Sequence, residues 1–103
     1  MKVAASMSHL NHDTKQFIDA KLNNPVCQYY ASSVKLCAVA EGLVDIYPRC
    51  GPTCEWDTCA ADAVVRYAGG GVYIYNFETH FADYKQMLKY NKENLLNPHF
   101  IVF

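Results

Sequence analysis

Trp56 and Asp57 stand between a Pro/Gly turn and a helix-forming stretch that carries almost no charge. An aspartate here can cap the helix, because its carboxylate accepts hydrogen bonds from the free N–H groups of the first turn. Those N–H groups also attract anions. A carboxylate beside a bound phosphate can hold Mg²⁺, which takes one or two carboxylates together with waters and phosphate oxygens. The two roles are compatible, and the spacing alone does not separate them.

Two basic residues occupy positions that suit phosphate binding. Lys35 is the lone cation in the first turn of an otherwise apolar helical stretch. Its ammonium group can neutralise a phosphate, or it can snorkel from the helix edge into water. Arg49 lies in the Pro/Gly turn and is either a solvated charge or a bidentate phosphate ligand.

Hydroxyl and imidazole groups follow the first predicted strand, at Ser6, Ser8 and His9. Ligands of α/β sheets gather where strands end, although a Ser/His loop is more often a simple turn. Together with Lys35, Arg49 and Asp57, these residues favour phosphate chemistry over redox or zinc chemistry.

The five cysteines do not have the spacing of a metal or disulfide framework. Cys50, Cys54 and Cys59 form C-x3-C-x4-C, which is not a zinc knuckle, and the four histidines do not fall at zinc-finger intervals from them. We therefore expect reduced thiols that are buried or half-buried.

Composition excludes several classes of protein. The chain has 103 residues, a formal net charge of −1 and 51% hydrophobic residues, so we expect one ordered domain spanning residues 1–103. The charge balance does not suit a protein that binds a nucleic acid polymer. We also expect no membrane span and no signal peptide, since the apolar runs are too short, and a cytoplasmic location follows by default.

Hydrophobic spacing and turn residues predict alternating strands and helices. We expect strands at 3–6, 26–30, 43–47, 72–75 and 99–103, and helices at 13–22, 32–41 and 57–67. Phe77, Phe81, Tyr84 and Leu88 recur at helical spacing, which favours a further helix there, followed by a polar loop at 91–97. The alternation indicates an α/β layered sandwich, in which helices flank a mixed sheet.

The stretch WDTCAADAVVRYAGG resembles the second signature of the magnesium-dependent, lithium-sensitive phosphomonoesterases, the inositol monophosphatase superfamily. The longer stretch SSVKLCAVAEGLVDIYPRCGPTCEWDT and the ending NKENLLNPHFIVF resemble its bacterial CysQ-type 3'(2'),5'-bisphosphate nucleotidase branch. The resemblance covers almost the whole chain and is densest over residues 32–71.

The resemblance implies a role for each matching residue. Asp57 corresponds to an active-site Mg²⁺ ligand, and Lys35 to a lysine near the phosphate or ribose of the substrate. Ser6, Ser8 and His9 match a loop that holds the nucleotide, with Met7 where arginine is usual. Ala31 replaces a usual glycine near Lys35. Arg49 stands where the inositol branch tends to carry an acidic residue, which favours a nucleotide substrate.

The first metal-binding signature of the superfamily and its upstream glutamate do not occur in this sequence. We therefore expect residues 1–103 to be the C-terminal lobe alone, without the N-terminal metal-binding lobe. The resemblance implies that the complete enzyme would hydrolyse 3'-phosphoadenosine 5'-phosphate to AMP with Mg²⁺. We expect the isolated chain to be inactive unless a separate N-terminal half joins it. The alternative is a non-catalytic remnant that binds nucleotide or self-associates.

Overall fold

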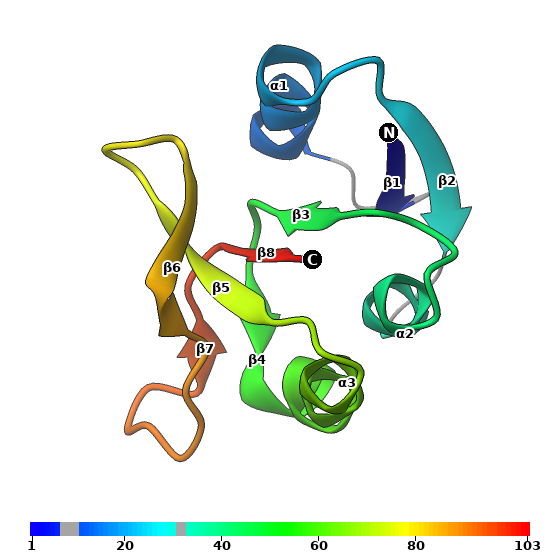
Figure 1. Cartoon of the computed structure of the whole chain (residues 1–103). Coiled ribbons are helices and arrows are strands. Elements are labelled where there is room, and N and C mark those ends of the chain that lie inside the picture. The colour runs from blue at the N-terminus through cyan, green and yellow to red at the C-terminus, as the bar shows by residue number, and fades with distance from the viewer. Residues whose placement is uncertain (7–10, 31–32) are drawn as a thin grey trace.

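The structure is a computed structural model that describes residues 1–6, 11–30 and 33–103. The strands within these residues are β1 (Lys2–Ser6), β2 (Val26–Tyr30), β3 (Tyr47–Arg49), β4 (Thr53–Cys54), β5 (Val72–Asn76), β6 (Phe81–Met87), β7 (Leu96–Asn97) and β8 (Phe100–Val102). The helices are α1 (His12–Lys21), α2 (Val34–Ala40) and α3 (Glu55–Tyr67) (Figure 1).

The main strands form a mixed sheet. β1 and β2 are parallel, whereas β3, β8, β5 and β6 pair in that order with antiparallel neighbours. A parallel bridge between Val3 and Ile46 joins the two groups, and the Ala4 N–H donates to the Ile46 carbonyl at 2.9 Å. The short strands β4 and β7 pair separately.

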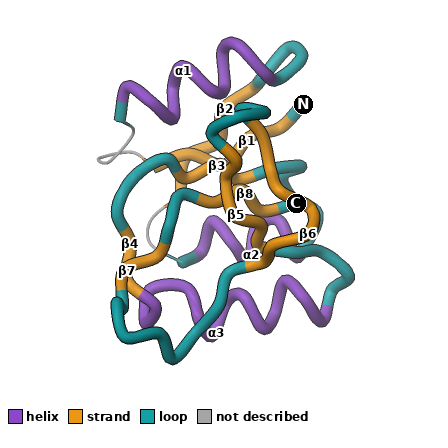
Figure 2. The backbone as a smooth tube through the Cα atoms, turned by 90° about the vertical axis from the view of Figure 1, so that its left-hand side faces the viewer, coloured by secondary structure: helices purple, strands orange, loops and turns teal. Residues whose placement is uncertain are grey.

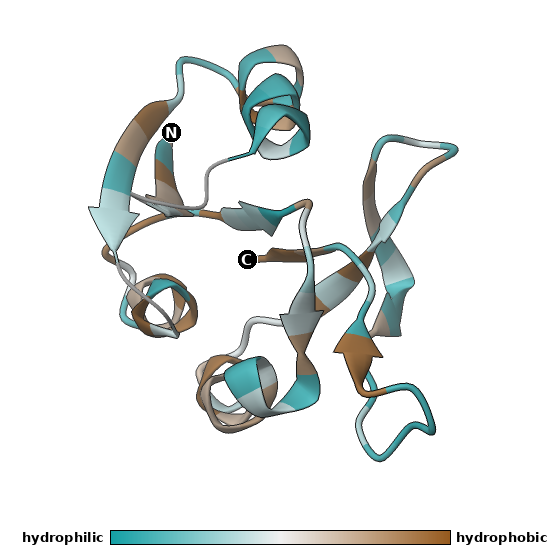
Figure 3. Ribbon diagram, turned by 180° about the vertical axis from the view of Figure 1, so that it is seen from behind, coloured by the Kyte–Doolittle hydropathy of each residue, from teal (hydrophilic) through white to brown (hydrophobic). Residues whose placement is uncertain are grey.

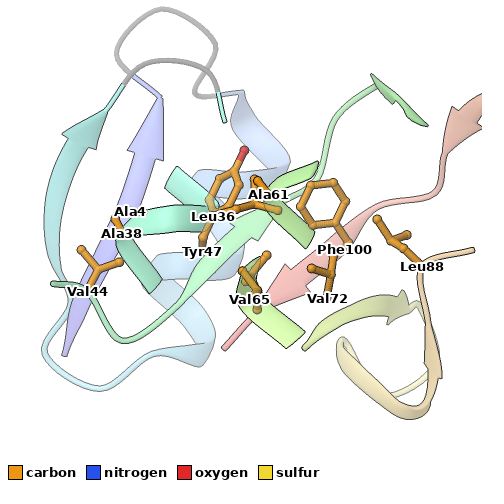
Figure 4. Packing of buried hydrophobic residues seen from close by; sticks show 11 residues of the cluster. Ala4, Leu36, Ala38, Val44, Tyr47, Ala61, Val65, Val72, Leu88 and Phe100 are labelled. Atoms are coloured by element: carbon orange, nitrogen blue, oxygen red, sulfur yellow. The ribbon is translucent and has the colours of Figure 1, made fainter. Parts of the chain in front are cut away.

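Helices cover both faces of this sheet, with α1 on one side and α2 and α3 on the other (Figure 1). Alternate residues of one strand therefore enter different cores. In β8, Ile101 packs with Phe17 and Ile18 of α1, whereas Phe100 and Val102 join the core under α2 and α3. Figure 4 shows the second of these cores, and in Figure 3 β8 is coloured as hydrophobic. The predicted layered α/β sandwich is confirmed.

Most predicted elements are present, with shifted ends. α1 begins at His12 and is capped by Asn11, whose Oδ1 accepts from the Thr14 N–H at 2.9 Å, so Asp13 lies inside the helix. α2 ends before Gly42, whose φ of +77° suits glycine. The strand predicted at 43–47 begins four residues later and ends two residues later, at β3, so Pro48 and Arg49 belong to a strand rather than to the turn.

The helix predicted from the spacing of Phe77 to Leu88 is wrong. This segment forms a hairpin in which β6 pairs with β5. Its register is irregular, because the two-residue step from Tyr73 to Tyr75 faces a five-residue step from Met87 to Ala82. This bulge breaks the alternation typical of a strand and leaves an aromatic spacing that imitates a helix. The predicted loop at 91–97 likewise ends in β7.

Candidate functional site

The candidate site lies at the edge of the sheet where the parallel strands end. β1, β2 and the segment at Ile46 run in the same direction, so their carboxyl ends share one edge. The three helices of the described residues begin on this side of the molecule, at the left in Figure 2. Helix starts carry partial positive charge, and this edge is where α/β sheets bind ligands.

Lys35, in the first turn of α2, is buried rather than snorkelling into water, with 3% of its surface exposed. Its Nζ donates to the carbonyl of Tyr30 at 3.2 Å, where β2 ends. The same Nζ lies 5.6 Å from the centre of the Tyr47 ring, a distance that suits a cation–π contact. Burial and the nearby charge of Arg49 lower the pKa of Lys35 from its ordinary value.

Arg49 is the last residue of β3 and lies near Lys35 and Tyr47. Its Nη2 donates to the Pro52 carbonyl at 3.3 Å, whereas its Nε is buried and has no hydrogen-bond partner among the described residues. Burial raises the pKa of the neighbouring Tyr47 to about 12, and the positive charge of Arg49 offsets part of that rise. The predicted pair of cations thus converges from a helix and a strand that are separate in the sequence.

No acidic side chain of the described residues is paired with Lys35 or Arg49. The ion pairs found within residues 1–6, 11–30 and 33–103 are Arg66 with Asp62 and Lys92 with Glu55. Lys35 and Arg49 both approach Tyr47, and neither has an acidic partner among the described residues, an arrangement that favours a bound anion.

Ser6 is the last residue of β1, is buried, and lies opposite Tyr30 in the parallel register. It therefore stands at the same edge as the lysine and the arginine. Ser8 and His9 lie outside the described residues, as does Ala31, so their predicted roles remain predictions.

Asp57 is the third residue of α3 rather than its cap. Cys54 occupies the cap position, and the Asp57 Oδ2 accepts from the Cys54 N–H at 2.9 Å in a capping box. α3 therefore begins two residues earlier than predicted. The Asp57 side chain remains exposed, so its cap function leaves it open to a ligand.

The described residues do not form a Mg²⁺ site by themselves. Within residues 1–6, 11–30 and 33–103, no group of three His, Cys, Asp or Glu side chains is gathered closely enough to hold a metal ion. Asp57 has the right donor chemistry and an exposed carboxylate, so it suits one ligand of a site completed by other groups. The five cysteines are free thiols, and Cys59 is exposed, unlike the buried or half-buried state that we predicted.

A polar network on the buried side of α3 was not foreseen from the sequence. Asp62, 1% exposed, accepts from Arg66 Nε at 2.7 Å and from the hydroxyl of Tyr90. The side chain of Asn97 donates to Thr58 Oγ1 at 3.1 Å. These bonds fasten the segment after β6 to the helix that carries Asp57. The ending Asn-Pro-x-Phe singles out Asn97 in the sequence, but it does not indicate that Asn97 bonds to Thr58.

A cavity of about 470 Å³ lies on the other face of the sheet, between α1 and the β5–β6 hairpin. Its walls include Phe17, Tyr75, Phe77 and His99. Of the predicted site residues that the structure describes, Ser6, Lys35, Arg49 and Asp57 do not line this cavity, so it is separate from them.

Comparison with known proteins identifies the family. The model of the inositol monophosphatase family matches residues 1–97. The chain belongs to this family. Its sequence is 36% identical over 100 residues to the 3'(2'),5'-bisphosphate nucleotidase CysQ of Escherichia coli strain K12, covering 97% of this chain. It is 42% identical over 73 residues to the CysQ nucleotidase of Haemophilus influenzae, covering 70% of this chain and 24% of that protein.

A solved structure is similar over nearly the whole chain. The crystal structure of CysQ from Bacteroides thetaiotaomicron, a bacterial member of the inositol monophosphatase family, matches with a TM-score of 0.86 and 46% identity. The match covers 99% of this chain but 36% of the Bacteroides chain. Likewise, the chain spans 37% of the length of the E. coli relative. In addition, no helix among the described residues is long and apolar enough to span a membrane.

Proposed function

We propose that this chain is the C-terminal lobe of a Mg²⁺-dependent 3'(2'),5'-bisphosphate nucleotidase that acts in the cytoplasm. The complete enzyme would release phosphate from 3'-phosphoadenosine 5'-phosphate and leave AMP. The observation that carries the proposal is the approach of Lys35 and Arg49 to Tyr47 at the sheet edge, without an acidic partner among the described residues. The named activity of the E. coli and Haemophilus relatives supports the same substrate class.

Each residue of the edge has a part in binding the nucleotide. Lys35 and Arg49 would neutralise phosphate charge, and burial strengthens their attraction to it because water screens the interaction less. Ser6, Ser8 and His9 would hold the nucleotide from the end of β1. Asp57 would be one Mg²⁺ ligand, and the metal, when bound, supplies charge neutralisation and a more acidic water.

We propose further that the chain alone does not catalyse the reaction. Metal-assisted attack on a phosphate needs several ligands around the metal, and the described residues offer Asp57 without two similar neighbours. The matched part is 37% of the E. coli relative, which leaves room for the remaining ligands elsewhere in the family fold.

A second candidate function is nucleotide binding without catalysis. The burial of Lys35 and its hydrogen bond to Tyr30 are formed in the chain by itself. This arrangement favours a chain that binds a phosphorylated nucleotide even where no reaction follows.

Calorimetric titration with 3'-phosphoadenosine 5'-phosphate, together with a phosphate-release assay, tests both ideas. We expect binding that weakens at least tenfold in Lys35→Met, and no phosphate release from the chain alone, with or without Mg²⁺ and Li⁺. Tyr67→Phe is the matched control, because Tyr67 is 96% exposed and outside the site. Equal binding by wild type and Lys35→Met would contradict the proposed site. Mg²⁺-dependent turnover that Asp57→Asn abolishes would show that the chain suffices for catalysis.

A further inference from the structure

We propose that the cavity between α1 and the β5–β6 hairpin binds a small molecule that carries both a quaternary ammonium group and an acidic group. The cavity measures about 470 Å³, and α1 and the hairpin form its two sides (Figure 3). Sites for small molecules commonly span about 300 to 1,000 Å³. Ser6, Lys35, Arg49 and Asp57 do not line this cavity. The binding would therefore be separate from the nucleotide chemistry proposed above.

Three aromatic rings form a corner of the cavity. Phe17 of α1, Tyr75 of β5 and Phe77 of the hairpin turn all line it. The Phe17 and Tyr75 rings stand at 74° to each other with centroids 5.9 Å apart, and the Tyr75 and Phe77 rings stand at 77° with centroids 5.1 Å apart. Rings set nearly at right angles can surround a compact group from more than one side. Aromatic cages that recognise quaternary ammonium ligands use such walls.

Asp13 provides negative charge beside this aromatic corner. It lines the cavity from the first turn of α1 and forms no ion pair with another described residue. Burial raises the pKa of Cys50, and the charge of Asp13 raises it further. Burial likewise raises the pKa of Tyr75, and Cys50 and Asp13 add to that rise. Asp13 thus lies close enough to act on a charge held at the aromatic corner, and it favours a cation there.

A quaternary ammonium group suits the aromatic corner better than a primary one. A primary ammonium has three N–H donors that need acceptors, whereas the rings of Phe17 and Phe77 have no acceptor atoms. A quaternary ammonium has no N–H, so it can leave water for the ring faces without losing hydrogen bonds. Phe77 is 67% exposed, and a ligand at the aromatic corner would cover part of that apolar surface.

Lys21 is the reason for including an acidic group in the ligand. It lines the cavity from the last turn of α1, eight residues after Asp13. Eight residues span about 12 Å along a helix, which exceeds the Debye length of about 8 Å at physiological ionic strength. Lys21 therefore repels a cation beside Asp13 only weakly. Its ammonium group can pair with an acid at the other end of the ligand, so the charges of the cavity fit a zwitterion.

Calorimetric titration of the chain with carnitine tests the proposal, and choline is the related ligand without the acidic group. The alcohol 3,3-dimethyl-1-butanol has the shape of choline without its charge. His80 and His99 also line the cavity, so the titrations are made at pH 8.5, above the range in which histidines ordinarily change charge. We expect carnitine to bind more tightly than choline, and the alcohol to bind about tenfold more weakly than choline.

Matched variants test the aromatic corner and its carboxylate. Phe77→Leu and Asp13→Asn should each weaken choline binding about fivefold or more. The controls are Tyr84→Leu and Asp19→Asn, which change exposed residues outside the lining and should leave binding unchanged. Phe77 and Asp13 are themselves exposed, so we expect all four variants to keep the melting temperature of the wild type within a few degrees.

Two lysine variants separate the ends of the ligand and the two sites. Lys21→Met should weaken carnitine but not choline, and the exposed Lys15→Met is its control. Lys35→Met should leave both ligands unchanged. No binding of carnitine or choline by the folded wild type would overturn the proposal, as would equal binding of choline and the uncharged alcohol. Binding that is lost in Lys35→Met but kept in Phe77→Leu would also overturn it, because the ligand would then occupy the proposed nucleotide site.

Discussion

At the scale of single residues, the feature that costs the fold the most free energy for its size is the buried ammonium group of Lys35. Burial penalises its charge, and the nearby Arg49 adds repulsion, so both lower its pKa. One hydrogen bond to Tyr30 and the Tyr47 ring offset part of this cost. A chain selected only for stability would place an apolar residue there. The arrangement is understandable if the charge serves a bound anion.

Replacing the charge should separate stability from binding. We expect Lys35→Met to keep the free energy of unfolding or raise it by about 1 kcal/mol, because an apolar chain of similar length replaces a poorly compensated ion. Urea denaturation at pH 7 measures this, alongside the titration described above. A loss of more than 2 kcal/mol, on the order of a removed structural ion pair, would indicate that Lys35 serves the fold instead.

Tyr47 makes stability depend on alkaline pH. Its pKa is raised to about 12, whereas a free phenol ionises near 10. Between these values the unfolded chain loses a proton that the folded chain keeps, so stability present below pH 10 is lost as the pH rises towards 12. Lys35 has the opposite effect on stability. Its pKa is lowered in the folded chain, so the unfolded chain keeps the proton longer, and stability rises with pH up to about 10.5.

We therefore expect wild type to lose about 2 to 3 kcal/mol more than Tyr47→Phe between pH 9.5 and pH 12. Urea denaturation across this range gives the difference, with the exposed Tyr67→Phe as control. Parallel plots of the free energy of unfolding against pH for wild type and Tyr47→Phe would mean that Tyr47 has its ordinary pKa in the folded protein.

At the scale of elements, α3 is fixed from two sides. The Cys54–Asp57 capping box holds its first turn, and the buried carboxylate of Asp62 in its middle accepts a hydrogen bond from the hydroxyl of Tyr90. Asp57 thus sits at the end of a helix that is itself anchored. If Asp57 is the Mg²⁺ ligand that we propose, such an anchor would hold its carboxylate in a defined place.

Removing the hydroxyl of Tyr90 should loosen this anchor. We expect Tyr90→Phe to lower the free energy of unfolding by about 1.5 to 3 kcal/mol, because the hydrogen bond goes to a buried carboxylate. Asp62 keeps its bond to Arg66 at 2.7 Å, which limits the loss. Urea denaturation measures the change, and an effect no larger than that of Tyr67→Phe would contradict it.

The same scale shows what sequence patterns can and cannot predict. α1 and α2 were placed within two residues at each end because their periodicity and stop residues are local. β6 was mistaken for a helix because its pairing with β5 is irregular and depends on a partner strand. Arg49 and Lys35 come together because β3 packs against α2, a contact that no local spacing reveals. The residue types of the site were predictable, but their convergence was not.

At the scale of the whole molecule, β8 is the strand that joins the layers. It pairs with β3 on one side and β5 on the other, and Phe100, Ile101 and Val102 are fully buried. Its side chains fill both cores, so damage there should spread to both faces of the sheet.

Ile101→Ala should therefore cost about 2 to 5 kcal/mol, the range for a large-to-small change in a closed core. Val64→Ala removes an apolar side chain that is 50% exposed and should cost much less. Thermal and urea unfolding of both variants tests the contrast. Similar losses in the two variants would show that the region around β8 is less closely packed than its burial indicates.

The central position of β8 also has a bearing on protein synthesis. A ribosome makes β3 and β5 before β8, so the two strands that flank it emerge with the space between them unfilled. Until β8 follows, neither core is closed, and the apolar side chains of α1, α2 and α3 have no finished sheet to cover. Domains tend to fold as units while the chain is being made, but this arrangement delays that step until β8 has been made. A nascent chain of this protein therefore exposes the apolar side chains of both cores for longer than one whose central strand is made first.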